Sequence, residues 1–161
     1  MASNLIEIKP VGAVSFTQIK CPSTYKMTST TLVDSGRNTD GFVVNDVVRE
    51  GIRKIEISWN FLTLSEFSTI AKLFESGHTG GSAPDKKFAC YIKYFDTVIG
   101  DFINSELGFT NLNGVDKSTD GNTSPREFYV GDRVTDTAKM VLDANMQPQG
   151  YSSVKLSLIE K

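Results

Sequence analysis

The chain has 161 residues, of which 39% are hydrophobic and 22% charged, and its formal net charge is −2 at pH 7. These values predict one globular domain, 1–161, that buries a core without disulfides or metals. No run of Lys or Arg exceeds two residues, which excludes a basic footprint for nucleic acid. No signal peptide and no membrane-length apolar stretch are found, so we expect synthesis in the cytoplasm and no membrane partner.

Strand patterns dominate the first third of the chain. The candidate strands here are Leu5–Lys9, Ala13–Ile19, Thr24–Val33 and Phe42–Arg49. The Gly/Asn/Asp-rich segment Asp34–Gly41 separates the last two strands. We therefore predict that this segment is a long hairpin tip.

A further strand is predicted from Lys54 to Phe61, where apolar and polar residues alternate. The apolar side is expected to carry Ile55, Ile57, Trp59 and Phe61, and the polar side Lys54, Glu56, Ser58 and Asn60. A period of two is typical of a half-buried strand.

One helix is predicted over about 64–75. Thr63 and Glu66 have the spacing of a capping box, and Leu62 and Phe67 that of a hydrophobic staple. An apolar stripe follows at helical spacing: Phe67, Ile70, Ala71 and Phe74. Gly77 is the predicted C-terminal stop.

Two long polar loops alternate with strands in the second half. Ser76–Lys87 precedes a strand, Phe88–Phe95, which is apolar on both faces and is expected to be covered on both. Thr110–Pro125 is the longest loop and lies between candidate strands at Val98–Ile103 and Glu127–Arg133. Loops of this length are usually functional or disordered.

The last predicted strand, Ser153–Leu158, again alternates polar and apolar residues. Together these elements predict a mainly β fold (α+β by count). Its expected form is a single β-sandwich or partly open β-barrel with one flanking helix and long loops.

No catalytic residue, cofactor site or metal site is predicted. The only histidine, His78, lies in a Gly-rich loop without rigid neighbours. Cys21 and Cys90 are interpreted as reduced thiols in strand-like segments facing the core, although a bridged pair stays open. Acid–base catalysis by two carboxylates requires that they face each other across a cleft. The sequence does not show whether any two of Asp96, Asp101 and Glu106 are placed in this way.

Two binding motifs were weighed. Asp116–Glu127 has the spacing of an EF-hand loop, with Gly121 at position six. Its flanks do not predict helices, and Thr123 replaces the usual aliphatic residue, so a polar loop is favoured over a calcium site. Three aromatic residues of one strand form a candidate stacking platform, but core packing is the favoured interpretation: Tyr91, Tyr94 and Phe95.

Three segments carry a family resemblance. RNTDGFVVNDVVREGIRKIEISWNFLTLSEFSTI combines an Arg-Asn loop, a valine-rich strand, a basic strand ending near tryptophan and a Leu-Ser-x-Glu helix start. Its matching positions are Arg37, Asn38, Gly41, Val44, Arg53, Lys54, Trp59, Leu64, Ser65 and Glu66. EFYVGDRV (Glu127–Val134) and VKLSLIEK (Val154–Lys161) follow in order. The three segments resemble small proteins encoded in tail modules of phages and prophages of Gram-positive bacteria, whose pattern the chain leaves at Thr110–Pro125 and Thr135–Gly150.

The resemblance implies a structural protein of the virion tail, without catalysis or cofactor. Expected roles are a ring- or tube-forming tail tube, tube-end or baseplate subunit, with copies of itself and other tail proteins as partners. Rings use head-to-tail interfaces, and exposed strand edges can pair with the next subunit. The loops Asp34–Gly41 and Thr110–Pro125 are expected to order on assembly.

Two alternatives stay open. One is a ligand-binding β-module for carbohydrate or calcium, and the other is a tail assembly factor. An enzyme is the least favoured reading, because no nucleophile, base and orienting group occur together in the pattern.

Overall fold

The computed structural model describes residues 6–37, 41, 43–75 and 89–160, with backbone only for 32–37 and 43–50. The strands are β1 (Glu7–Pro10), β2 (Thr17–Gln18), β3 (Thr24–Arg37), β4 (Val43–Thr63), β5 (Ala89–Asp96), β6 (Asp101–Asn104), β7 (Thr110–Asn111), β8 (Phe128–Val130), β9 (Lys139–Leu142) and β10 (Pro148–Glu160). The helices are α1 (Leu64–Lys72), a 3₁₀ turn η3 (Ser105–Leu107) and α2 (Val134–Thr137).

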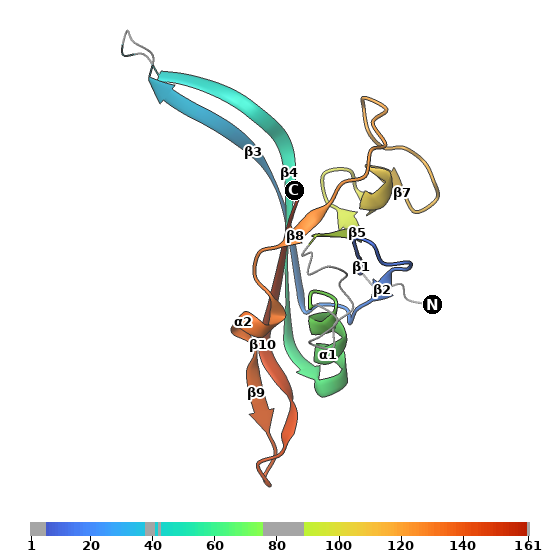
Figure 1. Cartoon of the computed structure of the whole chain (residues 1–161), viewed down its shortest axis with the longest axis vertical. Helices are drawn as coiled ribbons and strands as arrows, with labels where there is room; N and C mark the ends of the chain where they lie inside the picture. The colour runs from blue at the N-terminus through green and yellow to red at the C-terminus, as the bar shows by residue number, and fades with distance from the viewer. Residues whose placement is uncertain (1–5, 38–40, 42, 76–88, 161) are drawn as a thin grey trace.

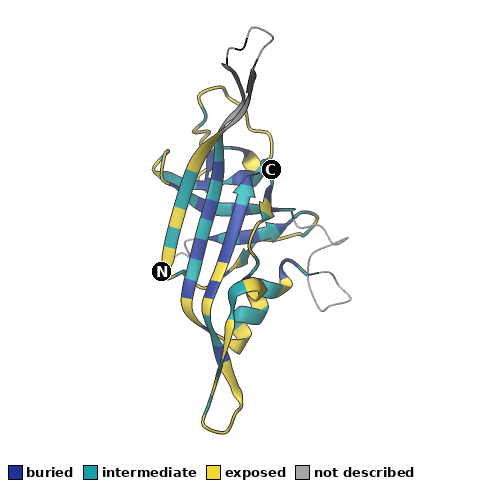
Figure 2. Ribbon diagram, turned by 90° about the vertical axis from the view of Figure 1, so that its left-hand side faces the viewer, coloured by how far each residue is buried: buried dark blue, intermediate teal, exposed yellow. Residues whose placement is uncertain are grey.

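The strands form one open antiparallel sheet in the order β2-β1-β5-β8-β10-β4-β3, with β9 beside β10 and β6 beside β5 (Figure 1). The predicted mainly β fold with a flanking helix is confirmed. The sheet does not close on itself, so β3 stays an edge strand. Alternating burial along β5 and β10 places the core on one side of this sheet (Figure 2).

The core gathers apolar residues from every major strand and from α1. Trp59 of β4 and Leu156 of β10 are each 1% exposed, and the Trp59 indole N–H donates to the Lys20 carbonyl at 2.9 Å. The other fully buried large side chains are Tyr94, Phe128, Ile6, Ile8, Ile19, Ile55, Leu62, Ile70, Ile92 and Ile103.

Helix α1 begins as its sequence predicts. The Thr63 hydroxyl accepts from the Glu66 N–H at 3.4 Å, and the Thr63 N–H donates to the Glu66 carboxylate at 3.0 Å. This second bond lowers the pKa of Glu66, because it stabilises the charged form. The helix packs on β4 and β10, where Phe67 stacks on Tyr151 with ring centroids 3.9 Å apart. The predicted stop, Gly77, lies outside the described residues.

Several strands differ from their predictions. The two strands predicted at Phe42–Arg49 and Lys54–Phe61 are parts of one 21-residue strand, β4. The second face of β5 is half-buried rather than covered. Only Thr17–Gln18 of the predicted Ala13–Ile19 strand is extended. A strand without a sequence prediction, β9, pairs with β10.

Candidate assembly surface

The projecting hairpin β3–β4 is the most prominent surface feature. The two strands pair from Thr24↔Ser58 to Arg37↔Val43. Beyond the pair Thr30↔Ile52 the hairpin leaves the rest of the sheet (Figure 1). We call this distal part, residues 32–37 and 43–49, the arm. The predicted tip Asp34–Gly41 is corrected in part, because Asp34–Arg37 belongs to β3 and pairs with β4, and residues 38–40 lie outside the described part.

The arm is a two-stranded ribbon, and among the described strands none lies beside it in the sheet order. An isolated two-stranded hairpin is marginally stable in water, since it has no sheet or helix to cover it. Both of its backbone edges are templates for pairing with another strand. A projecting ribbon of this kind is therefore better suited to contact with a partner than to isolation in solvent.

The edge of the sheet continues this template into the body. β3 pairs only with β4, so its other edge is not paired within the described sheet from Thr24 onward. Tyr25 and Met27 of this end are half-buried against the core, and the exposed side chains between Thr24 and Thr30 are hydroxyl residues and Lys26, the only charge. Edge strands of monomers are usually short or protected by charge or bulges. The body portion Thr24–Thr30 has Lys26 as its single protection of this kind, because the β3–β4 register shifts only beyond Thr30.

A second hairpin, β9–β10, projects from the opposite end of the molecule (Figure 1). It carries three exposed apolar side chains: Met140 at 53%, Leu142 at 42% and Met146 at 72%. The Asp143 carboxylate closes the turn by accepting from the Asn145 and Gln147 N–H groups. Among the described strands β9 pairs only with β10. The hairpin thus adds an unpaired strand edge and exposed apolar side chains to the candidate assembly surface.

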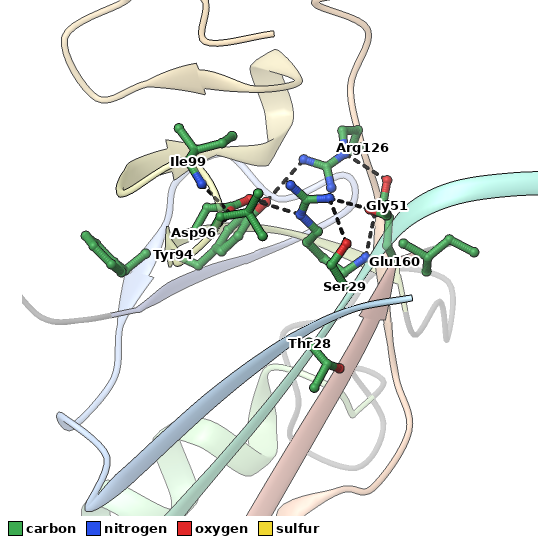
Figure 3. A network of polar contacts seen from close by, with 12 residues as sticks. Thr28, Ser29, Gly51, Tyr94, Asp96, Ile99, Arg126 and Glu160 are labelled. Atoms are coloured by element: carbon green, nitrogen blue, oxygen red, sulfur yellow. Dashed lines mark hydrogen bonds and ion pairs between the residues drawn. The ribbon is translucent and has the colours of Figure 1, made fainter. Parts of the chain in front are cut away.

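A polar network joins the root of the arm to the body (Figure 3). Arg53 of β4 forms an ion pair with Asp96 at 3.1 Å, and its side chain also donates to Ser29 at 3.3 Å and to the Gly51 carbonyl at 2.7 Å. The Arg53 backbone N–H donates to Glu160 at 3.0 Å. The side chain and the backbone N–H of Arg53 therefore connect four strands: β3, β4, β5 and β10.

Arg126 extends this network from the loop before β8. Its Nε donates to Glu160 at 2.8 Å and its Nη1 to the Tyr94 hydroxyl at 3.2 Å. Burial opposes the charge of Arg126, but the bonds to Glu160 and Tyr94 outweigh it and raise its pKa. Its Nη2 has no hydrogen-bond partner within the described part of the chain. The guanidinium instead lies 3.7 Å from the Phe109 ring centroid, a cation–π contact.

The three carboxylates considered for acid–base chemistry have separate structural partners. Asp96 is buried with Arg53 and accepts from the Val98 and Ile99 N–H groups. Glu106 pairs with Lys9 at 2.6 Å, and Asp101 accepts from the Asn111 amide at 3.1 Å. Each carboxylate is thus held by cations, amides or backbone groups rather than aimed with another into a cleft.

The Asp116–Glu127 loop folds on itself. The Asp116 carboxylate accepts from the Ser118 N–H and hydroxyl, which lowers its pKa. Asp120 and Asn122 likewise accept from the N–H groups two residues further on. In the described ranges, no group of three His, Cys, Asp or Glu side chains is placed to hold a metal ion. The side chains with EF-hand spacing form local turns instead.

The aromatic residues of β5 do not form a shared platform. Tyr94 is fully buried and packs edge-to-face with Phe128, with ring centroids 5.7 Å apart. Burial raises the pKa of Tyr94 to about 12, so its hydroxyl stays protonated. Tyr91 and Phe95 belong to the opposite, half-buried face of the strand.

The two cysteines differ in environment, and one prediction about them is wrong. Both are free thiols, but Cys21 is exposed before β3, whereas Cys90 is buried in β5. The core position predicted for Cys21 fails because the alternating pattern of β3 begins only at Thr24. Burial raises the pKa of Cys90 to about 12. His78 lies outside the described residues.

Thiol labelling is expected to separate these cysteines. Ellman's reagent should react with one thiol in the folded protein at pH 8 and with two after unfolding, because only thiolates react and Cys90 is both buried and protonated. The Cys21→Ser variant should show no fast reaction while folded. Fast labelling of two thiols in the native protein would contradict the buried position of Cys90.

No family model, curated protein or solved structure matches the chain. Within the described residues, no helix has the length and apolar character needed to cross a membrane.

Sequence reasoning missed the network because its members are spread along the chain. Arg53 and Asp96 are 43 positions apart, and Arg53 and Glu160 are 107 apart. The available signal was Arg53 itself, which stands on the apolar face of an otherwise regular alternation with Ile55, Ile57 and Trp59. A cation at a core-facing position indicates a buried anionic partner.

Proposed function

We propose that the protein is a structural subunit that assembles with copies of itself through the arm and the edge of β3. The observation that carries this proposal is the arm, a ribbon paired only within itself and projecting from the body. Such a ribbon gains stability when another strand or surface covers it. No catalytic role is included, since the carboxylates and the buried thiol have structural environments.

Strand directions favour a head-to-tail arrangement. The order β9-β10-β4-β3 alternates in direction, so β3 and β9 run antiparallel. A copy related by rotation about an axis along the strands keeps these directions. Its β9 edge would meet β3 as an antiparallel neighbour only with a shift along the strands as well, because β9 lies level with Phe61–Thr63 of β4 whereas β3 begins level with Ser58. Repeated rotation with such a shift builds an open helical tube rather than a closed ring.

The sequence resemblance adds a biological setting to this proposal. Resemblance to tail-module proteins of phages and prophages supports a place in a phage or phage-derived tail, as a tail-tube, tube-end or baseplate subunit. The long hairpin and open edge agree with such a role, in which a subunit contacts several neighbours. Partners are then further copies of the chain and other tail proteins, and the location is the virion.

Removal of the arm tests the proposal. We would replace residues 32–50 by Asn-Gly, which joins Thr31 to Gly51 through a two-residue hairpin turn. The full chain is expected to form rings, tubes or defined oligomers in analytical ultracentrifugation and negative-stain microscopy. The armless variant is expected to sediment as a monomer, because the main contact is gone.

The matched control is Val14→Ser, which changes a side chain that is 98% exposed and lies outside the arm, the β3 edge and the β9–β10 hairpin. This variant should keep most of the assembly, and near-ultraviolet circular dichroism should show an intact body in both variants. A full chain that stays monomeric at its highest soluble concentration would overturn self-assembly. Equal assembly of a folded armless variant would overturn the role of the arm.

A further inference from the structure

The root of the arm contains a backbone irregularity beside the buried network. The β3–β4 register shifts twice, between Thr30 and Leu32 and between Leu32 and Val33. Both shifts place extra residues on β4, which is the signature of β-bulges. Bulges bend and twist a ribbon, so the direction in which the arm leaves the body is decided at this point.

Gly51 lies in the first bulge with a φ of +69°. A Cβ atom there would lie 2.8 Å from Arg53 Nη1, and the Gly51 carbonyl accepts from the same Nη1 at 2.7 Å. The bulge therefore requires a residue that tolerates positive φ and leaves room for the guanidinium. Bulge and guanidinium fit together as one unit.

We propose that Arg53 is a positioning residue that latches the arm in a fixed direction relative to the body. The guanidinium holds both strands of the arm root, through Ser29 on β3 and the Gly51 carbonyl on β4. The same group is anchored to the body by Asp96, which is 0% exposed. The latch thus connects the projecting ribbon to the most deeply buried carboxylate of the network.

The C-terminal strand forms the second anchor. Glu160 accepts from the Arg53 N–H and from Arg126 Nε, so both oxygens of the carboxylate are used at the arm root. Phe109 lies 5.3 Å from the Arg53 guanidinium carbon and 3.7 Å from that of Arg126. The latch is therefore held from β5, from β10 and from the loop that precedes β8.

Energetic reasoning supports a positioning role over a purely stabilising one. Buried ion pairs are often no more stable than apolar residues of similar volume, since desolvation offsets the attraction. An apolar core would complete the sheet below the arm equally well. It would not hold a bulged ribbon at one angle, because apolar contacts are not directional. A fixed arm also loses less entropy when it meets a partner.

Spin-label distances in the monomer test this inference, independently of assembly. We would attach nitroxides at Ser35→Cys in the arm and Thr69→Cys on α1, in the Cys21→Ser background, and measure pulsed dipolar spectra at dilute concentration. The parent should show one narrow distance distribution. Arg53→Met should broaden the distribution at least about twofold, since the directional bonds are lost while a similar side-chain volume stays.

A milder variant keeps the test decisive if Arg53→Met does not fold. Ser29→Ala removes only the bond from the guanidinium to β3 and is expected to broaden the distribution by a smaller amount. Thr31→Ala, on the same strand but not a partner of Arg53, should leave it unchanged. An unaltered width in folded Ser29→Ala and Arg53→Met would overturn the latch. Equal broadening in Thr31→Ala would also overturn it.

Discussion

The Asp96→Ala variant is expected to lose about 3–5 kcal/mol of its free energy of unfolding, because removing one member of a buried ion pair leaves the other charge uncompensated. Asp96 is fully buried, and its loss strands Arg53 in the interior. The same change removes the acceptor of the Val98 N–H at 2.9 Å and of the Ile99 N–H at 3.2 Å.

Asp96→Asn separates these effects. The amide oxygen can still accept from Val98 and Ile99, while the charge opposite Arg53 is gone. We expect Asp96→Asn to lose less free energy of unfolding than Asp96→Ala. The difference between the two variants measures the contribution of the hydrogen bonds from the Val98 and Ile99 N–H groups. Unfolding by urea, followed by far-ultraviolet circular dichroism, gives both values at one dilute protein concentration, because self-association would add to the apparent stability.

The control for Asp96 is Asp120→Ala. Asp120 is exposed, and its carboxylate accepts from the Asn122 N–H within a loop. Its replacement should change the free energy of unfolding by about 0.5 kcal/mol or less. A similarly small effect of Asp96→Ala would show that Arg53 finds water or another anion, and would remove the basis of the latch.

Local signals predicted the parts of the fold that depend on neighbours in sequence. The capping box of Thr63 and Glu66 marked the start of α1, and the alternation around Trp59 marked the buried face of β4. Both signals act over a few residues, where backbone geometry alone decides which side chains meet. The same reasoning predicted a mainly β fold from the number of such alternations.

Long-range pairing decided what the sequence did not show. The sequence predicted one strand that ends at Arg49 and another that begins at Lys54. β4 is continuous between them, because bulges absorb the extra residues. β9 has little alternation of its own and is extended because β10 pairs with it. Of the candidate assembly surface, the sequence predicted only the hairpin turn at the end of the arm. The open edge of β3 follows from the sheet order, which the sequence does not show.

Trp59→Ala is expected to be as damaging as Asp96→Ala, for a different reason. The side chain is 1% exposed and lies opposite Val154 of β10. Truncation of a buried tryptophan leaves a large cavity and costs about 3–5 kcal/mol. The Lys20 carbonyl also loses its indole donor at 2.9 Å, so one of the hydrogen bonds that hold the segment before β3 to β4 is lost.

Trp59→Phe distinguishes packing from the hydrogen bond. Phenylalanine fills much of the site but cannot donate to Lys20, so its loss should fall well below that of alanine. Circular dichroism is the readout, because Trp59 is the only tryptophan and fluorescence disappears with it. Leu142→Ala, at an exposed position of β9, is the control and should cost about 0.5 kcal/mol or less. If Trp59→Ala lost no more free energy of unfolding than Leu142→Ala, the sheet face that supports β3 and the arm would not be the core of the protein.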